Sequence, residues 1–330
     1  MASANLPSAF ISTLPRFPIN FNGLIIHSDG RYERPIRNDT SPAGTDTLTG
    51  VHSKDVVISH ESKVFVRLYI PKTINPNRKL PTLVYYHGGA FVSDSAASST
   101  YHKTLNLITT ESNVIVVSVN YRLAPEYPIP IAYEDSWEAI KWVASHVRGN
   151  GQESWLNDHA DLQNVFLAGD SAGANIAHNM AIRVGLSGHE NVFNVSGVIM
   201  VHPYFGGEDP IGAESTKFKR AKENMDKLWL LANPSGNGSD DPLFNPGMDP
   251  NISAFGSSKI LVCVAENDIV RERGLNYKKV MEASGWKGNV ELMESKGEKH
   301  IFFLFDTSCE NSCLLRSRIC NFINPIRSKA

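Results

Sequence analysis

The sequence predicts an α/β fold with a mainly parallel, doubly wound sheet. First, runs of β-branched and other apolar residues alternate with segments whose apolar residues recur at helical spacing, as in βαβ units. Second, the pentapeptide Gly169 to Gly173 stands between such a run and such a segment. Third, 330 residues with 42% hydrophobic and 20% charged side chains suffice for one large domain with a cap.

The strands can be assigned in order along the chain. Residues 1–50 are irregular and are expected to form an N-terminal cap or lid segment ahead of the main domain at 51–330. Val56 to Ile58 and Val64 to Ile70 predict a hairpin of edge strands that Pro71 ends. The later apolar runs predict strands at Leu83–Tyr86, Val114–Val119, Asn164–Ala168, Val198–Val201, Ile260–Ala265 and Val290–Met293.

Helical spacing of apolar residues predicts the connecting helices, which are Tyr101–Glu111, Ala132–Val147 and Ala172–Val184. The β-branched run Val114 to Val119 is expected at the centre of the parallel sheet. After Val198 to Val201, the sixth core strand, the alternation stops. Residues 205–250 include a helix-like stretch from Ala221 to Leu231 with Trp229, so they predict an inserted cap beside the site.

Composition argues against several classes of function. The net charge of −2 gives no electrostatic attraction for nucleic acid or an anionic membrane. No apolar run is long enough to span a bilayer, and no signal-peptide pattern begins the chain, so a cytoplasmic location is expected. No glycine-rich phosphate loop or zinc motif is found, and no cofactor or metal is expected. Four cysteines are expected to be buried free thiols: Cys263, Cys309, Cys313 and Cys320.

The pentapeptide Gly169 to Gly173 has the G-x-S-x-G form of a nucleophile elbow, a sharp turn between a strand and a helix. Ser171 is expected at its strained apex, where the N-terminus of the helix favours developing negative charge. Side chains at Gly169 and Gly173 would clash with the neighbouring strand and helix. The alternative is a chance pentapeptide in a loop, against which the flanking strand and helix argue.

A serine hydroxyl becomes a nucleophile when a base takes its proton and an acid holds that base. With this type of elbow the order along the chain is Ser, acid, His. The strand Ile260 to Ala265 is followed by Asp268, which lies beyond the strand by the distance that a turn needs; Glu266 is the alternative acid. Of the 11 histidines, His300 alone follows Asp268, so it is predicted to be the base.

A tetrahedral intermediate carries a negative oxygen, which needs fixed N–H donors. Ala172, which follows the nucleophile, is expected to supply one donor. The other donors are expected from the segment His87 to Ala90, with Gly88 and Gly89 as the predicted residues of this oxyanion hole. The alternative is that the glycines only turn a tight corner. His87 is expected to brace the loop through hydrogen bonds.

A further group of residues predicts a polar brace. Tyr121 to Glu126 and the pair Glu134-Asp135 are expected to form buried hydrogen bonds between a loop and a helix, with a role in stability.

The motifs together resemble the plant carboxylesterase family of α/β hydrolases, which is related to hormone-sensitive lipase. They are His87-Gly88-Gly89, Val119 to Glu126, Ala132 to Asp135, Gly169 to Gly173 and His300. The resemblance covers nearly the whole chain after residue 50 and implies the α/β-hydrolase fold. Ala90 stands where many relatives have a third glycine, a small departure that leaves the N–H donors in place.

Within that family, three phrases are similar to 2-hydroxyisoflavanone dehydratases: Gly50 to Asp55, Ala174 to Asn179 and Ser284 to Gly288. The family also includes carboxylesterase-like cyclases of alkaloid biosynthesis and the gibberellin receptors. In the receptors the base histidine is replaced and an N-terminal lid closes over the hormone. The presence of His300 therefore argues against a pure receptor.

The leading hypothesis is a serine carboxylesterase that hydrolyses esters of small plant metabolites, in which Ser171 attacks, His300 transfers the proton and Asp268 orients His300. The second is a dehydratase or cyclase of plant specialised metabolism, because the same donors can hold an enolate. The third is small-molecule sensing on a lidded scaffold. In each case the expected partner is a small molecule, without nucleic acid or membrane, and the expected assembly is a monomer or homodimer.

Overall fold

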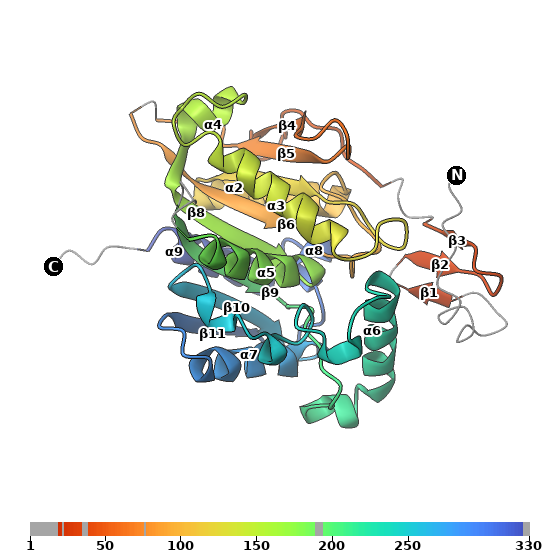
Figure 1. Ribbon diagram of the computed structural model, residues 1–330. Helices are drawn as coiled ribbons and strands as arrows, with labels where there is room; N and C mark the ends of the chain where they lie inside the picture. Colours follow the sequence, from red (N-terminus) through yellow and green to blue (C-terminus); the bar gives the residue numbers. More distant parts are fainter. Residues whose placement is uncertain (1–18, 22, 35–38, 76, 189–193, 326–330) are drawn as a thin grey trace.

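The computed structural model describes residues 19–21, 23–34, 39–75, 77–188 and 194–325. Its centre is an eight-stranded sheet in the order β11-β10-β9-β8-β6-β7-β5-β4 (Figure 1). The strands are β4 (His52–Val57), β5 (Phe65–Ile70), β6 (Leu80–Tyr86), β7 (Ile115–Asn120), β8 (Ala160–Asp170), β9 (Val195–Val201), β10 (Lys259–Ala265) and β11 (Asn289–Ser295). Neighbours from β7 to β11 pair in parallel, whereas β4, β5 and β7 pair antiparallel. The sheet is therefore mainly parallel, as predicted.

Two expectations about the antiparallel end of the sheet are wrong. Of the predicted hairpin, only β4 is an edge strand, because β5 is buried between β4 and β7. β7 is not central to the parallel region: it is parallel to β6 and antiparallel to β5, so it marks the boundary. A strand buried on both faces has the same apolar, β-branched composition whichever way its neighbour runs.

Helices cover both faces of the sheet. One face carries α2 (Ser99–Ser112), α8 (Phe302–Phe305) and α9 (Glu310–Ile323); the other carries α3 (Ile131–Ala144), α5 (Ala172–Leu186) and α7 (Arg271–Ala283). The short helix α4 (Ser154–His159) precedes β8. Along β6, Leu83 and Tyr85 enter the core on the α2 face, while Val84 and Tyr86 enter the core on the α5 face. None of the helices in the described part of the chain has the length and apolar character of a membrane span.

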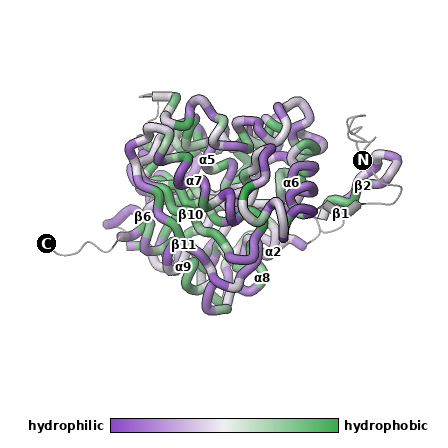
Figure 2. The backbone as a smooth tube through the Cα atoms, turned by 90° about the horizontal axis from the view of Figure 1, so that it is seen from below, coloured by the Kyte–Doolittle hydropathy of each residue, from purple (hydrophilic) through white to green (hydrophobic). Residues whose placement is uncertain are grey.

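Between β9 and β10 the chain leaves the sheet. This stretch contains α6 (Lys219–Ala232) and four 3₁₀ turns, Gly212–Ser215, Gly238–Asp240, Pro246–Met248 and Ile252–Ala254. Figure 2 shows α6 as largely hydrophilic, in contrast to the hydrophobic strand β10. However, Trp229 of α6 is fully buried, stacks on Phe244 at 4.5 Å between ring centroids, and meets Phe91 edge-on at 6.0 Å. Since Phe91 follows Ala90, the insertion packs directly against the loop predicted to hold the oxyanion.

The N-terminal segment is described in part, because residues 1–18, 22 and 35–38 lie outside the described residues. Within it, β1 (Ile19–Phe21), β2 (Leu24–Ile26) and β3 (Tyr32–Glu33) form a separate antiparallel sheet near α6 (Figures 1 and 2). The Arg34 side chain is 6% exposed and pairs with Glu126, with 2.6 Å between Nη2 and Oε2. It also donates to the carbonyls of Val92 and Ala124. Arg34 therefore ties this segment to the main domain.

All four cysteines are free thiols, as predicted. Their expected burial holds for Cys263 of β10, where burial raises the pKa of the thiol to about 12. Cys313 is exposed, and Cys309 and Cys320 are half-buried, because α9 packs on the sheet with one face only.

Candidate active site

The predicted site residues meet at one edge of the sheet. Gly88 follows β6, Ser171 follows β8, Asp268 follows β10 and His300 follows β11. Parallel strands bring their carboxyl ends to the same edge, so residues far apart in the sequence come together there.

Ser171 occupies a strained turn. Its backbone has φ 51° and ψ −119°, a conformation of a kind that costs on the order of 1–3 kcal/mol. A Cβ atom on Gly173 would overlap the carbonyl oxygen of Tyr86, and one on Gly169 would overlap the backbone of Gly173. The two glycines therefore allow α5 to lie directly on the end of β6, with Ser171 at the helix N-terminus.

Ser171, His300 and Asp268 are hydrogen-bonded in series. His300 Nε2 lies 3.0 Å from Ser171 Oγ, and His300 Nδ1 lies 2.7 Å from Asp268 Oδ2. The Asp268 side chain is buried, and its Oδ1 accepts the N–H of Val270 at 3.1 Å. When Nδ1–H donates to the carboxylate, the lone pair of the neutral imidazole at Nε2 faces the serine hydroxyl. This arrangement can accept the proton of Ser171.

The structure distinguishes the two candidate acids. Glu266 is exposed, and its Oε2 accepts the N–H of Gly297 at 2.7 Å, so it ties the β10 loop to the loop that precedes His300. Asp268 is the carboxylate in contact with the imidazole.

His300 and Asp268 each stabilise the charged form of the other. Burial alone would raise the pKa of the Asp268 carboxyl, but the charge and hydrogen bond of His300 outweigh burial and the pKa is lowered. Burial alone would lower the pKa of the His300 imidazole, but Asp268 outweighs burial and the pKa is raised above its ordinary value of 6.5. His300 is therefore a stronger base when neutral, and it is protonated below this raised pKa.

A second buried histidine, His202, lies behind the pair. Its Nδ1 accepts the N–H of Ile301 at 2.9 Å and lies 3.8 Å from Asp268 Oδ2. Burial lowers the pKa of His202 to about 3, so the ring stays neutral and remains an acceptor. Ligand atoms of His202, Asp268 and His300 lie within 4.8 Å of one another, as in a metal site. All three side chains hydrogen-bond to protein groups.

The loop after β6 differs in one respect from the prediction. The N–H of Gly88 is not free, because it donates to the hydroxyl of Tyr101 at 2.7 Å. In the part of the chain that the structure describes, the N–H groups of Gly89, Ala90 and Ala172 have no protein acceptor. Gly89 and Ala90 both have positive φ, 96° and 51°, which turns this stretch of backbone sharply. The candidate oxyanion donors are therefore Gly89, Ala90 and Ala172.

Sequence reasoning did not single out Asp170, which precedes the nucleophile. Its buried carboxylate accepts the hydroxyls of Tyr85 and Tyr101, each at 2.8 Å. Burial raises the pKa of Asp170 to about 6, although both hydroxyls oppose the shift. Hydrogen bonds thus run from Gly88 through Tyr101 to the elbow. A carboxylate at the end of a buried strand needs hydrogen-bond donors. This requirement is the signal in the sequence from which a buried network around Asp170 could have been predicted.

The predicted braces are present except at Glu134, which is exposed and pairs with Arg183 of α5 at 2.9 Å. The His87 ring stacks on Tyr121 at 4.2 Å, and the Tyr121 hydroxyl donates to the carbonyls of His87 and Gly88 at 2.7 and 3.0 Å. Burial lowers the pKa of His87 to about 4, which suits a neutral bracing ring. Arg122 donates two hydrogen bonds to the buried carboxylate of Asp135, from Nε at 3.0 Å and from Nη2 at 2.7 Å.

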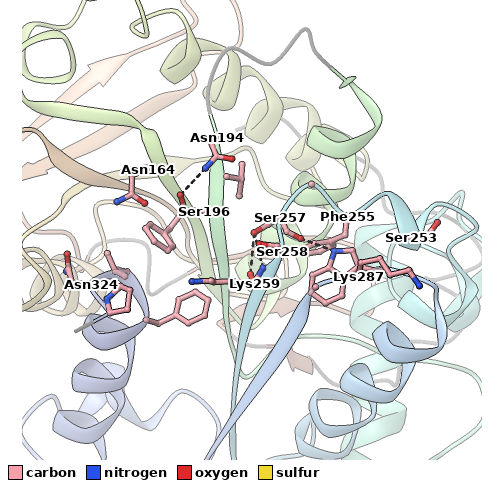
Figure 3. A pocket seen from close by; sticks show the side chains of 18 of the residues that line it. Asn164, Asn194, Ser196, Ser253, Phe255, Ser257, Ser258, Lys259, Lys287 and Asn324 are labelled. Carbon is pink, nitrogen blue, oxygen red and sulfur yellow. Dashed lines mark hydrogen bonds between the residues drawn. The ribbon is translucent and has the colours of Figure 1, made fainter. Parts of the chain in front are cut away.

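A cavity of about 1000 Å³ lies elsewhere (Figure 3). Its lining includes Asn164 of β8, Asn194, which precedes β9, and Lys259, where β10 begins. Ser171 follows the opposite end of β8, so this cavity is separate from the candidate active site.

Comparisons with known proteins identify the fold and the family. A family model described as the alpha/beta hydrolase fold matches residues 83–304. The chain is 43% identical to probable carboxylesterase 2 of Arabidopsis thaliana, over 92% of this chain and 95% of that one. It is 41% identical to 2-hydroxyisoflavanone dehydratase of Glycyrrhiza echinata, over 91% and 94%. A solved esterase of Pyrobaculum calidifontis is similar with a TM-score of 0.68 and 26% identity, over 83% and 84%.

The raised pKa of His300 predicts how the reactivity of Ser171 depends on pH. The rate at which paraoxon phosphorylates Ser171 should fall as pH decreases, with a midpoint above 6.5, because protonated His300 cannot accept a proton. Asp268→Asn should lower this rate by about 10⁴-fold and shift the midpoint down, since the carboxylate that raises the pKa is gone. Glu266→Gln is the matched control and should behave as wild type. Equal losses in the two variants would contradict the assignment of the acid.

The network through Tyr101 predicts a difference between two tyrosine variants. Tyr101→Phe and Tyr85→Phe each remove one hydrogen bond to Asp170 and should each lower the free energy of unfolding by about 1–3 kcal/mol. Only Tyr101→Phe also releases the N–H of Gly88, so only this variant should lose paraoxon reactivity, by about tenfold. Denaturant titration and labelling kinetics measure the two effects. Equal reactivity of the two variants would show that Tyr101 does not position the loop.

Proposed function

Because the chain belongs to the plant carboxylesterase family of α/β hydrolases, we propose that Ser171, His300 and Asp268 hydrolyse carboxylic esters of small molecules. The protein is a carboxylic ester hydrolase by its family and its esterase neighbours. The observation that carries the assignment of residues is the series of hydrogen bonds from Ser171 Oγ to His300 at 3.0 Å and from His300 to Asp268 at 2.7 Å.

In the proposed reaction, His300 takes the Ser171 proton as Oγ attacks the ester carbonyl carbon. The carbonyl oxygen becomes negative and receives hydrogen bonds from the N–H groups of Gly89, Ala90 and Ala172. His300 then gives its proton to the leaving alcohol, which departs and leaves Ser171 acylated. Water, deprotonated by His300, attacks this acyl group, and the acid is released as Ser171 regains its proton.

A second candidate is elimination of water from a hydroxylated ketone. It is favoured by the 41% identity to a protein named 2-hydroxyisoflavanone dehydratase. Here His300 would remove a proton from the carbon next to the ketone, the same N–H groups would hold the enolate oxygen, and the hydroxyl would leave as water. This route forms no acyl-serine, so Ser171 would not be acylated.

The surrounding segments complete the proposal. Residues 1–50 act as a lid segment and 205–250 as a cap of the main domain at 51–330. Support comes from the ion pair of Arg34 with Glu126, which joins the first segment to the main domain, and from the contact of Trp229 with Phe91, next to the oxyanion loop.

We also propose a cytoplasmic enzyme that acts on small plant metabolites as a monomer or homodimer. Light scattering of the purified protein should give the mass of one or two chains. Microscopy of a fluorescent fusion should show the protein in the cytoplasm. A larger assembly or an organellar signal would contradict this part.

The serine mechanism predicts the outcome of hydrolysis assays. Ser171→Ala should lower kcat for p-nitrophenyl acetate by about 10⁴-fold or more, while the melting temperature stays near that of wild type. Mass spectrometry of the wild-type enzyme quenched during turnover should find an acetyl group on Ser171. Unimpaired hydrolysis by Ser171→Ala would overturn the proposal. Conversion of a 2-hydroxyisoflavanone without any ester cleavage would favour elimination.

A further inference from the structure

A cavity of about 290 Å³ lies beside the loops that carry the reacting groups. It is lined by residues of the N-terminal segment, the oxyanion loop, the start of α2 and the chain after His300. Ile301, which lines it, directly follows His300, and the lining residue Ser93 donates its hydroxyl proton to the carbonyl of Gly89 at 3.2 Å. A substrate whose ester group lies at Ser171 can therefore extend into this cavity.

On one wall of the cavity, serine and aspartate side chains act as hydrogen-bond acceptors, and Thr100 beside them adds one hydroxyl donor. Each serine hydroxyl has a single proton, and the proton of Ser93 is used as described above. The hydroxyl of Ser95 donates to Asn120 Oδ1 at 2.8 Å, and that of Ser98 donates to Asp94 Oδ1 at 3.3 Å. With these protons engaged, the serine oxygens offer the ligand lone pairs only. The wall therefore suits a group that donates hydrogen bonds.

Asp94 is the strongest acceptor of this wall. It is half-buried, and burial raises the pKa of its carboxyl. Among the described residues, no cation pairs with it. A half-buried carboxylate that has hydroxyl partners and no counter-charge is stabilised by further O–H donors. Its φ of 69° is a conformation that Asp, Asn and Gly tolerate better than other residues do.

The opposite wall is apolar. It is formed by Ile301, Leu304 and Phe305, and the Phe305 side chain is 74% exposed. Arg34 and Asp39 also line the cavity, and the positive charge of Arg34 is balanced by its ion pair with Glu126. The cavity thus combines acceptors on one side with hydrocarbon on the other, and it is about large enough for one substituted ring.

We propose that this cavity binds a hydroxyl-bearing part of the ester substrate, whose O–H groups donate to Asp94 and the neighbouring serine oxygens while its carbon face lies on Leu304 and Phe305. The inference rests on the proposed hydrolysis at Ser171 and names the substrate class for it. Carboxylate and phosphate groups are disfavoured, because they would bring lone pairs and negative charge to a wall of acceptors.

Two matched pairs of esters test this proposal. One pair carries the hydroxyl on the acyl part of the ester, and the other carries it on the alcohol part. The first pair is methyl 3-(4-hydroxyphenyl)propanoate and methyl 3-phenylpropanoate, and the second is 2-(4-hydroxyphenyl)ethyl acetate and 2-phenylethyl acetate. In at least one pair, wild-type kcat/KM for the hydroxylated ester should exceed that for its parent by about 10- to 100-fold.

Substitutions of Asp94 locate the effect. Asp94→Gly removes the carboxylate and fits the positive φ without strain, so the preference ratio should fall to about one. Asp94→Asn keeps one acceptor oxygen and should retain part of the ratio. Asp158→Asn, at an exposed position of α4, is the matched control and should keep the full ratio. Melting temperatures show whether each variant is folded.

The outcomes separate this inference from the proposed function. If wild type hydrolyses parent and hydroxylated esters equally well, or if a folded Asp94→Gly keeps the full ratio, the cavity assignment is overturned and hydrolysis at Ser171 stands. If wild type cleaves no ester at all, p-nitrophenyl acetate included, the proposed function fails and this inference fails with it.

Discussion

The close approach of α5 to the end of β6 is the constraint on which the site depends. At Gly173 a hydrogen is the largest group that fits against the carbonyl of Tyr86. This contact holds the start of α5 beside the chain that leaves β6, so Ser171 and the N–H groups of Gly89 and Ala172 are brought to one place. The strain at Ser171 is a consequence, because the chain must reverse within one residue.

The same helix also holds the insertion in place. Asn175, fully buried on α5, donates to the carbonyls of Tyr204 at 3.0 Å and Leu243 at 2.8 Å, and it accepts the hydroxyl of Tyr133 at 2.7 Å. A buried amide with all these partners fixes the direction of the chain on either side of α6. The insertion and Ser171 are therefore both held by the same helix, α5.

Much of the fold and of the candidate site could be predicted, because local rules decide those parts. The alternation of apolar runs and helical segments follows from layers of helix on sheet, and the elbow needs Gly169 and Gly173 at fixed offsets from the serine. Chain order then leaves His300 as the one histidine after the acid. The choice of Asp268 over Glu266 rested on a turn of the right length, and the structure places Asp268 against the imidazole.

The remainder depends on contacts between distant residues, for which the sequence holds no local signal. Nothing in β5 or β7 reveals that they run antiparallel to each other. The engagement of the Gly88 N–H follows from Tyr101, which lies on α2, the next helix along the chain, and is directed to this loop by its bond to Asp170. A glycine motif predicts which backbone can approach a substrate, and the tertiary structure decides which N–H groups remain free.

The most direct test of the central claim is a crystal structure of the protein after reaction with a p-nitrophenyl alkylphosphonate. The account predicts phosphorus bonded to Ser171 Oγ, with the phosphonyl oxygen about 2.7–3.1 Å from the N–H nitrogens of Gly89 and Ala172, and with His300 still bonded to Asp268. Phosphorus on another residue, or a phosphonyl oxygen directed away from both N–H groups, would contradict it.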